Sequence, residues 1–281
     1  MRLFFRPVDK KYLGLGALPN GTFDDTSTWK PITNYLEDGA VNYPDRSMFK
    51  IGNGDGKIVE TYSYKETNDK ANQVANGLIE KVGVKKGDKV GMYMLNCAEF
   101  VLSILAIHKT GGVQVPINKD EKGERLAYVI NYSEMVVLVV DPSGLPLIQE
   151  IADQLENLKV VYVTGEPSEV PDKIGDIAAE PFNNLQEFPT DNPNVDVKIS
   201  DKERCMFTSG TTGKPKGVVR EHGGVVLTVR AYLQQQGIRS DDIMMSVLSL
   251  GHANAQAMCL FTSIGAGATA VFFPRFSASN F

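Results

Sequence analysis

The stretch MFTSGTTGKPKGVV, residues 206–219, places three glycines, four hydroxyl side chains and two lysines between two apolar flanks. A loop that binds a polyphosphate needs inward-facing backbone N–H groups, hydroxyl donors and at least one lysine. This stretch supplies all three, because its glycines leave the backbone free to turn its N–H groups toward a ligand. It therefore predicts a phosphate-binding loop. The residues expected to contact phosphate are Thr208, Ser209, Gly210, Thr211, Thr212, Gly213, Lys214 and Lys216.

The spacing differs from that of a Walker A loop, which has a glycine five residues before its Gly-Lys pair and Ser or Thr after it. Thr208 stands at the first of these positions and Pro215 at the last. The β-branched residues after the loop also favour a strand over a helix that would cap a phosphate. The alternative for the stretch is a glycine-rich hairpin whose lysines are only solvated.

Residues 45–164 alternate strand-like and helix-like segments, which predicts a largely parallel sheet with helices on its faces. Ser63 and Glu66 form a capping box at the start of a helix that continues to about Val82. Asn96 and Glu99 resemble a second cap, leading into the apolar segment FVLSILAIHKTGG. An α/β fold follows from this order of elements.

Residues 165–200 hold five of the fourteen prolines among acidic and amide residues, which predicts a surface connection. Strands at 204–208, 217–221, 243–250 and 269–274 are expected beyond it, with helices at 223–237 and in the Gly/Ala-rich segment after 250. The sequence thus predicts two lobes, 32–164 and 201–281, joined by 165–200, with residues 1–31 as an N-terminal extension.

The composition indicates a globular protein and argues against nucleic-acid-binding, membrane-spanning and disulfide-rich classes. Hydrophobic residues make up 42% of the 281 residues, enough for a packed core, and the net charge of −5 argues against nucleic acid as the main partner. The longest apolar runs fall far short of the ~20 residues of a membrane span. Three widely spaced cysteines give neither a disulfide framework nor a zinc site, so a reduced, cytoplasmic protein is expected.

Other candidate sites carry competing interpretations. GNGDGK (52–57) lacks the dinucleotide spacing and predicts a hairpin turn. Asp241 and Asp242 are typical of the turn between a helix and a strand, and the alternative is that this carboxylate pair binds Mg²⁺. His108, in the last turn of an apolar helix, is explained by a favourable contact with the helix dipole. By contrast, His252, Asn254 and Gln256 follow the apolar end of an expected strand, where open α/β sheets bind ligands. A buried structural histidine is the alternative for His252.

The stretch at 206–219 with its flanks, SDKERCMFTSGTTGKPKGVV (200–219), resembles the phosphate-binding signature of the adenylate-forming superfamily, which includes acyl-CoA synthetases. Segments 61–79, 87–118 and 240–258 resemble further blocks of that superfamily in the same order, so the resemblance covers roughly Ile32 to Phe281. It implies ATP, Mg²⁺, coenzyme A and a small carboxylic acid as ligands. ATP phosphates would be held by the loop, and the acid would lie in a pocket lined by His252, Asn254 and Gln256.

The resemblance also indicates a branch and an incomplete domain. Residues 248–258 contain no aspartate of the kind that holds an amino-acid substrate, and GHANAQAM (251–258) is most similar to the crotonobetaine/carnitine-type CoA ligases. No catalytic residue and no metal ligand is assigned. The later blocks and the small C-terminal domain of the superfamily are not found, so an inactive N-terminal part that self-associates through exposed apolar surface is expected. The alternative is a non-catalytic fragment that binds a nucleotide or a partner.

Overall fold

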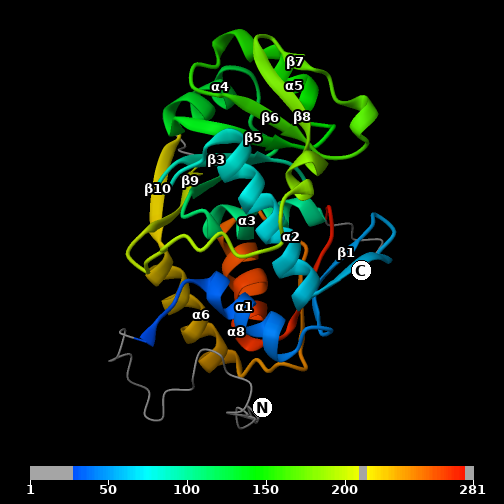
Figure 1. Ribbon diagram of the computed structural model, residues 1–281, viewed down its shortest axis with the longest axis vertical. Coiled ribbons are helices and arrows are strands. Elements are labelled where there is room, and N and C mark those ends of the chain that lie inside the picture. The colour runs from blue at the N-terminus through cyan, green and yellow to red at the C-terminus, as the bar shows by residue number, and fades with distance from the viewer. Residues whose placement is uncertain (1–27, 209–213, 276–281) are drawn as a thin grey trace.

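Two β-sheets and the helices around them make up the computed structural model, which describes residues 28–208 and 214–275 (Figure 1). This is the expected α/β class. The helices are α1 (Ile32–Asn42), α2 (Tyr64–Gly77), α3 (Ala98–Lys109), α4 (Gly123–Ser133), α5 (Leu145–Glu150), α6 (His222–Gln236), α7 (Ala253–Ala255) and α8 (Thr262–Ala266). The strands are β1 (Ser47–Gly52), β2 (Ile58–Ser63), β3 (Lys89–Tyr93), β4 (Val113–Pro116), β5 (Met135–Val140), β6 (Val160–Val163), β7 (Lys173–Ile174), β8 (Ile177–Pro181), β9 (Lys202–Thr208), β10 (Lys216–Glu221), β11 (Ile243–Ser246) and β12 (Thr269–Phe272).

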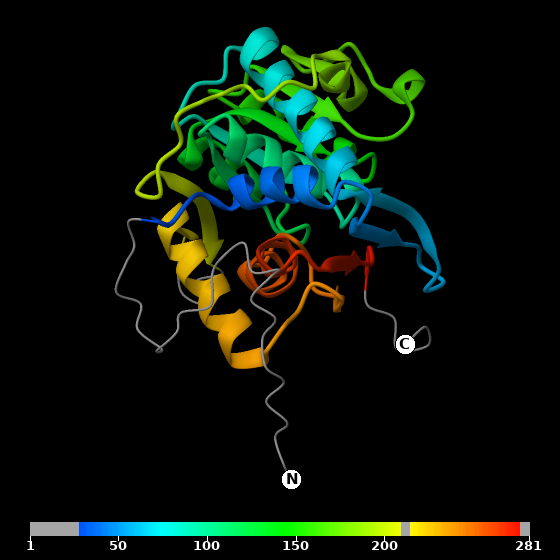
Figure 2. The same cartoon turned by 60° about the horizontal axis from the view of Figure 1, so that its bottom comes forward.

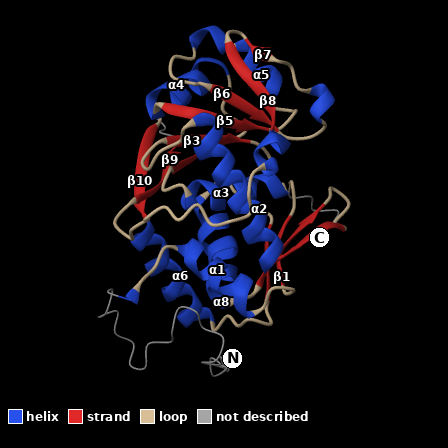
Figure 3. Cartoon of the chain, viewed as in Figure 1, coloured by secondary structure: helices blue, strands red, loops and turns tan. Residues whose placement is uncertain are grey.

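The larger sheet has eight strands in the order β10-β9-β4-β3-β5-β6-β8-β7 and occupies the upper part of the view in Figure 3. Its centre is parallel from β9 through β8, and antiparallel pairs close both edges, β9 with β10 and β7 with β8. The chain enters at β3, adds β4 on one side and then β5 on the other. Such a reversal of strand order marks the place where open α/β sheets bind ligands, at the carboxyl ends of the strands.

The smaller sheet joins the two ends of the chain. Strand β1 pairs antiparallel with β2 and parallel with β12, and β12 pairs parallel with β11. The hairpin between β1 and β2 closes through residues 52–57, as the sequence predicted, with Gly56 at φ 77°. Figure 2 shows this hairpin beside β12 at the edge of the molecule.

One apolar core lies between the two sheets. Another lies on the opposite face of the larger sheet, under α4 and α5. Helix α3 crosses the first core and is buried at every position except Glu99. Its sequence is apolar nearly all round, which is the composition of a helix enclosed on all sides. The glycine pair after α3 closes the turn into β4, with Gly111 at φ 70°.

One predicted helix cap is confirmed and one is wrong. Ser63 accepts a hydrogen bond from the backbone N–H of Glu66 at 3.2 Å, and the Glu66 carboxylate accepts from the N–H of Ser63 at 2.8 Å. Before α3, however, the N-cap is Cys97, and no side chain caps the helix. Asn96 instead makes long-range hydrogen bonds, because its buried amide faces the segment around Leu250 rather than the helix.

The segment 165–200 is more than a connection. It supplies β7 and β8, and β8 extends the parallel sheet next to β6. Ile174, Ile177 and Ala179 are buried in the second core, and their apolar side chains outweigh the nearby prolines, of which Pro171 precedes β7 and Pro181 ends β8. Residues 165–172 and the part after Phe188 run as irregular surface segments before β7 and before β9.

The sheets also cut across the expected lobes. Strands β9 and β10, assigned from the sequence to the second lobe, belong to the larger sheet, whereas β1 of the first lobe pairs with the C-terminal β12. Pairing between residues more than 200 positions apart has no local signal, which explains the difference. Within residues 28–208 and 214–275, no helix has both the length and the apolar composition needed to cross a membrane.

Candidate functional site

The loop that the sequence predicts to bind phosphate, called here the phosphate loop, connects β9 to β10 at one edge of the larger sheet. The ladder pairs Thr208 with Lys216 and Phe207 with Gly217, so the last described residue before the loop lies opposite the first residue of the returning strand. The strand predicted after the loop is confirmed, and α6 begins only at His222. Phosphate at this loop would therefore meet a hairpin end and not a helix N-terminus, as the departure from the Walker A spacing indicated.

Three of the eight expected phosphate contacts can be placed. Thr208, Lys214 and Lys216 are exposed at the open end of the hairpin, and the Thr208 hydroxyl lies 3.5 Å from the carbonyl of Lys216. The other five, Ser209, Gly210, Thr211, Thr212 and Gly213, lie outside the described residues. The structure thus brings two lysines and a hydroxyl to one end of one hairpin, which is a suitable donor set for an anion.

The segment that carries His252 is anchored to the carboxyl end of β3. The Asn96 amide donates to the carbonyls of Leu248 and Phe273, both at 2.9 Å, and its oxygen accepts from the N–H of Leu250 at 2.7 Å. Asn96 itself follows β3 by three residues. His252 is thereby held above the strand ends where the order of the sheet reverses, with its side chain exposed.

The three residues expected around the acid do not share one environment. His252 and Asn254 are exposed, whereas Gln256 is fully buried. The Gln256 amide donates to the side-chain oxygen of Gln114 at 3.0 Å and to the carbonyl of Leu250 at 2.8 Å. Its oxygen accepts from Arg204 at 3.2 Å and from Gln114 at 3.1 Å, so its capacity for hydrogen bonds is already filled within the chain.

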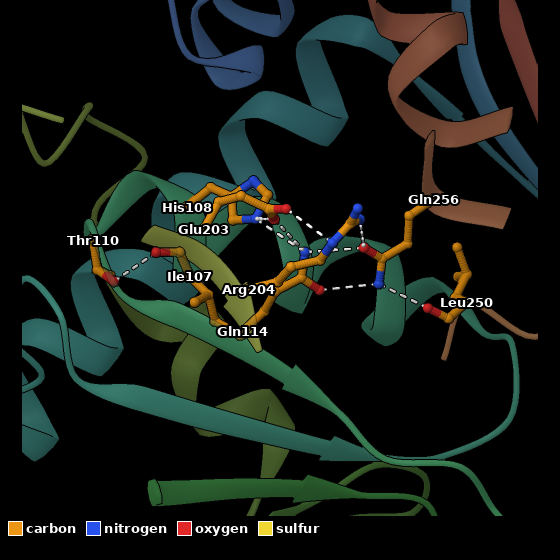
Figure 4. A network of polar contacts seen from close by, with 8 residues as sticks. All are labelled: Ile107, His108, Thr110, Gln114, Glu203, Arg204, Leu250 and Gln256. Atoms are coloured by element: carbon orange, nitrogen blue, oxygen red, sulfur yellow. Dashed lines mark hydrogen bonds and ion pairs between the residues drawn. The ribbon is translucent and has the colours of Figure 1, made fainter. Parts of the chain in front are cut away.

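Gln256 belongs to a buried polar network that joins three distant parts of the sequence (Figure 4). Gln114 on β4 also donates to Glu203 at 3.1 Å, and Glu203 lies 3.2 Å from the Nε2 of His108 on α3. Arg204 pairs with Glu203 at 3.0 Å. Because Glu203 and Arg204 lie in β9, the strand that enters the phosphate loop, the network ties that strand to the segment of His252.

His108 was expected to be explained by the dipole of its helix, but the structure gives it side-chain partners. Its ring contacts the Glu203 carboxylate and stacks edge-on against the His222 ring at 4.9 Å, so a partner side chain, rather than the helix dipole alone, accounts for its position. Burial lowers the pKa of Arg204, and the neighbouring Glu203 carboxylate opposes that shift. Burial also lowers the pKa of His222 to about 2, with the nearby His108 and Lys86 acting in the same direction.

Asn96, Gln114, Glu203 and Arg204 were not identified as site residues from the sequence. The available signal was the charged pair Glu203-Arg204 directly before the apolar residues Cys205–Phe207 of the strand that leads into the loop. Charged residues are almost never fully buried unless they are paired, and both are buried here. The partners of the pair, His108, Gln114 and Gln256, come from other helices and strands, so a local pattern could not have identified them.

No group of three or more acidic, histidine or cysteine side chains able to hold a metal occurs in the described ranges 28–208 and 214–275. Asp242 accepts from the N–H of Arg239 at 2.7 Å, and Asp241 lies 3.5 Å from the Arg239 guanidinium. This is the turn that the sequence favoured at the pair.

The sequence of the chain matches a known family and curated relatives. A family model described as AMP-binding enzyme matches residues 36–281, which confirms the resemblance seen in the sequence. Crotonobetaine/carnitine–CoA ligase of Salmonella agona (strain SL483) is 30% identical over 248 residues, which cover 87% of this chain and 47% of that protein. The chain therefore spans about half the length of the curated relatives it matches.

Solved structures agree with the fold. The crystal structure of the anthranilate CoA ligase AuaEII in complex with anthranoyl-AMP matches with a TM-score of 0.77 at 27% identity, over 88% of this chain and 46% of that one. The inhibitor-bound N-terminal domain of FACL13 from Mycobacterium tuberculosis matches with a TM-score of 0.76 at 25% identity, over 89% of this chain and 59% of that one.

Proposed function

The chain belongs to the AMP-binding enzyme family, and on that premise we propose that it is the ATP-phosphate-binding part of an acid–CoA ligase. In the proposed reaction a carboxylate attacks the α-phosphorus of ATP, releasing pyrophosphate and leaving an acyl-adenylate. The thiolate of coenzyme A then displaces AMP to give a thioester. The observation that carries the proposal is the exposed cluster of Thr208, Lys214 and Lys216 at the end of the β9–β10 hairpin.

These residues suit the leaving group. Pyrophosphate departs with growing negative charge, and donors already directed at it stabilise the transition state by roughly 3 kcal/mol each. Lysine is a point charge on a flexible stem, so Lys214 and Lys216 can follow the phosphates as they separate. Mg²⁺ bound to the phosphates would neutralise part of the same charge, and no step is assigned to it.

For the acid, we place His252 and Asn254 at the substrate and Gln256 behind them. Both exposed side chains stand above the carboxyl end of β3, and Gln256 fixes their segment through the carbonyl of Leu250. Residues 248–258 contain no aspartate, which favours a simple carboxylic acid over an amino acid. The 30% identity to a crotonobetaine/carnitine–CoA ligase supports the same class of substrate. We place the reaction in the cytoplasm, since Cys97, Cys205 and Cys259 are all free thiols.

A second, narrower function is favoured for the isolated chain. Its described residues offer contacts to phosphate but no cluster of metal ligands, so we propose that the 281-residue chain binds nucleotide phosphates without forming a thioester. Its role would then be that of a nucleotide- or partner-binding part. The two functions differ in turnover and agree in phosphate binding.

The test separates binding from turnover. Pyrophosphate and ATP are titrated into the purified chain by calorimetry, for the wild type and for Lys214→Ala and Lys216→Ala. Each lysine variant is expected to bind about tenfold to a hundredfold more weakly, the value of a hydrogen bond to a charged group. Lys202→Ala, at the far end of β9, is the matched control and should leave affinity unchanged.

Turnover is measured on the same preparations with ATP, Mg²⁺, coenzyme A and a panel of short and medium acids. Thioester formation by the chain alone would contradict the narrower function. Undiminished binding by both lysine variants would contradict the assignment of the loop, and with it the ligase proposal.

A further inference from the structure

Helix α4 contacts both ends of the phosphate loop through aromatic rings. Tyr128 and Tyr132 stack on each other with ring centroids 5.2 Å apart, and the Tyr132 ring meets Phe207 edge-on at 6.1 Å. On the other side of the loop, the Lys214 ammonium lies 5.1 Å from the centroid of the Tyr128 ring. Phe207 lies just before the loop and Lys214 just after its undescribed residues.

Helix α4 holds the two tyrosine rings in fixed positions because one side of the helix is packed in the second core. Residues four apart lie on one face of a helix, which brings Tyr128 and Tyr132 together. Leu126, Val129 and Ile130 on the same helix are fully buried against the larger sheet, so α4 is fixed in place. The Tyr132 side chain is 62% exposed, and its position is therefore not explained by burial in the core.

The stem of the hairpin packs Phe207 against the facing strand. Gly217 is its partner across the ladder, and a Cβ at that glycine would lie in ordinary contact with the Phe207 ring at 3.5 Å but would clash with the sulfur of Cys205 at 2.8 Å. The glycine therefore leaves room for the Cys205 side chain on the face of the hairpin that Phe207 shares. The aromatic residues of α4 and the base of the loop thus form one packed unit.

From this arrangement we propose that Tyr128 is a positioning residue that holds Lys214 for the phosphates of the nucleotide, an inference that rests on the proposed function. The face of a tyrosine ring attracts an ammonium group within about 6 Å. An exposed lysine otherwise loses side-chain freedom when it binds. Contact with the ring restricts Lys214 beforehand, and an ammonium has three donors, so those turned away from the ring can reach phosphate.

The experiment measures pyrophosphate affinity of the full 281-residue chain by calorimetry. Tyr128→Leu removes the ring, and Tyr128→Phe keeps its face while removing the hydroxyl. Tyr128→Leu is expected to weaken binding about two- to fivefold, the equivalent of an exposed cation–π contact of about 0.5–1 kcal/mol. Tyr128→Phe should bind as the wild type does, because the ring face is retained.

Tyr128→Leu is then combined with Lys214→Ala in a double variant. If the ring acts through the lysine, Tyr128→Leu should cause no further loss in that background. A loss of equal size in both backgrounds would show that the ring acts by general packing and would overturn the proposal. So would unchanged or tighter binding by Tyr128→Leu, because tighter binding would mean that the ring competes with phosphate for the lysine.

Failure of the proposed function would look different. In that case Lys214→Ala alone would leave pyrophosphate affinity unchanged, whatever the residue at position 128. Urea unfolding of each variant verifies that it is folded, and Tyr128→Gln, a polar replacement at this half-buried position, takes the place of Tyr128→Leu if that variant does not fold.

Discussion

Replacing Gln256 with leucine tests how much the buried polar network contributes to the free energy of unfolding. Gln256 makes hydrogen bonds to Gln114, Arg204 and Leu250, at distances of 2.8–3.2 Å, and is inaccessible to water. Leucine has a similar volume and no polar atoms. The substitution therefore removes the hydrogen bonds while keeping the space filled.

The expected loss follows from the three partners that remain. A buried polar group left without a partner costs ~1–3 kcal/mol, and more when it is charged, as Arg204 is. Three such groups at ~1–2 kcal/mol each, less ~1 kcal/mol gained by burying a more apolar side chain, give a loss of about 3 kcal/mol in the free energy of unfolding. That is a large part of the ~5–15 kcal/mol that stabilises an ordinary domain, yet the chain should still fold.

Urea denaturation, extrapolated to zero denaturant, measures the loss. Asn254→Ala is the matched control, since this exposed amide is two residues away and should change stability by less than about 0.5 kcal/mol. Gln256→Leu combined with Gln114→Leu should cost less than the sum of the two single changes, because both partners of one pair are then apolar. A loss below about 1 kcal/mol for Gln256→Leu would refute the reasoning.

Three further results are expected. Ser63→Ala removes the cap of α2 and should lower the free energy of unfolding by ~1 kcal/mol in urea; no change would mean that the capping box contributes nothing. His222 has a pKa of about 2 when folded and ~6.5 when unfolded, so stability should be complete above pH ~6.5 and fall by ~1.4 kcal/mol per pH unit below it. His222→Phe should flatten that slope by one proton between pH 6.5 and 4.5, and an unchanged slope would contradict the burial of a neutral ring. Ile243 and Met245 are 65% and 55% exposed on the edge strand β11, so lysine at both positions should reduce self-association in sedimentation velocity, whereas a wild-type chain that is already monomeric would contradict this.

Features with a local cause could be predicted from the sequence. The capping box of α2 and the hairpin at 52–57 depend on residues within a few positions of each other, and both are confirmed. Helix α3 could be predicted because its apolar residues cover the whole circumference. The strand after the phosphate loop followed in the same way from the β-branched Val218 and Val219.

Features that depend on distant partners could not be predicted. Asn96 has the residue type and spacing of a cap, but its amide bonds segments about 150 and 177 residues away. The pairing of β1 with β12 joins residues more than 200 positions apart. Gln256 lies near His252 in the sequence, but its buried side chain accepts a hydrogen bond from Arg204, a partner 52 residues away that no local pattern identifies.

The strands within residues 165–200 were not predicted for a different reason. Prolines and acidic residues dominated the composition of that segment and outweighed the short apolar pattern of β8. A two-residue strand such as β7 has no periodicity of its own, and it forms only because β8 lies beside it. Context from the larger sheet therefore decided the structure here.

The central claim is that the end of the β9–β10 hairpin binds the phosphates of the nucleotide. The most direct test is a titration of the isotope-labelled chain with inorganic pyrophosphate, followed by two-dimensional amide NMR. Saturable amide shifts are expected that are largest at Lys214, Lys216 and Gly217, smaller at His252, and lost in Lys214→Ala. Shifts centred on any other part of the chain, or no saturable shift at millimolar pyrophosphate, would contradict it.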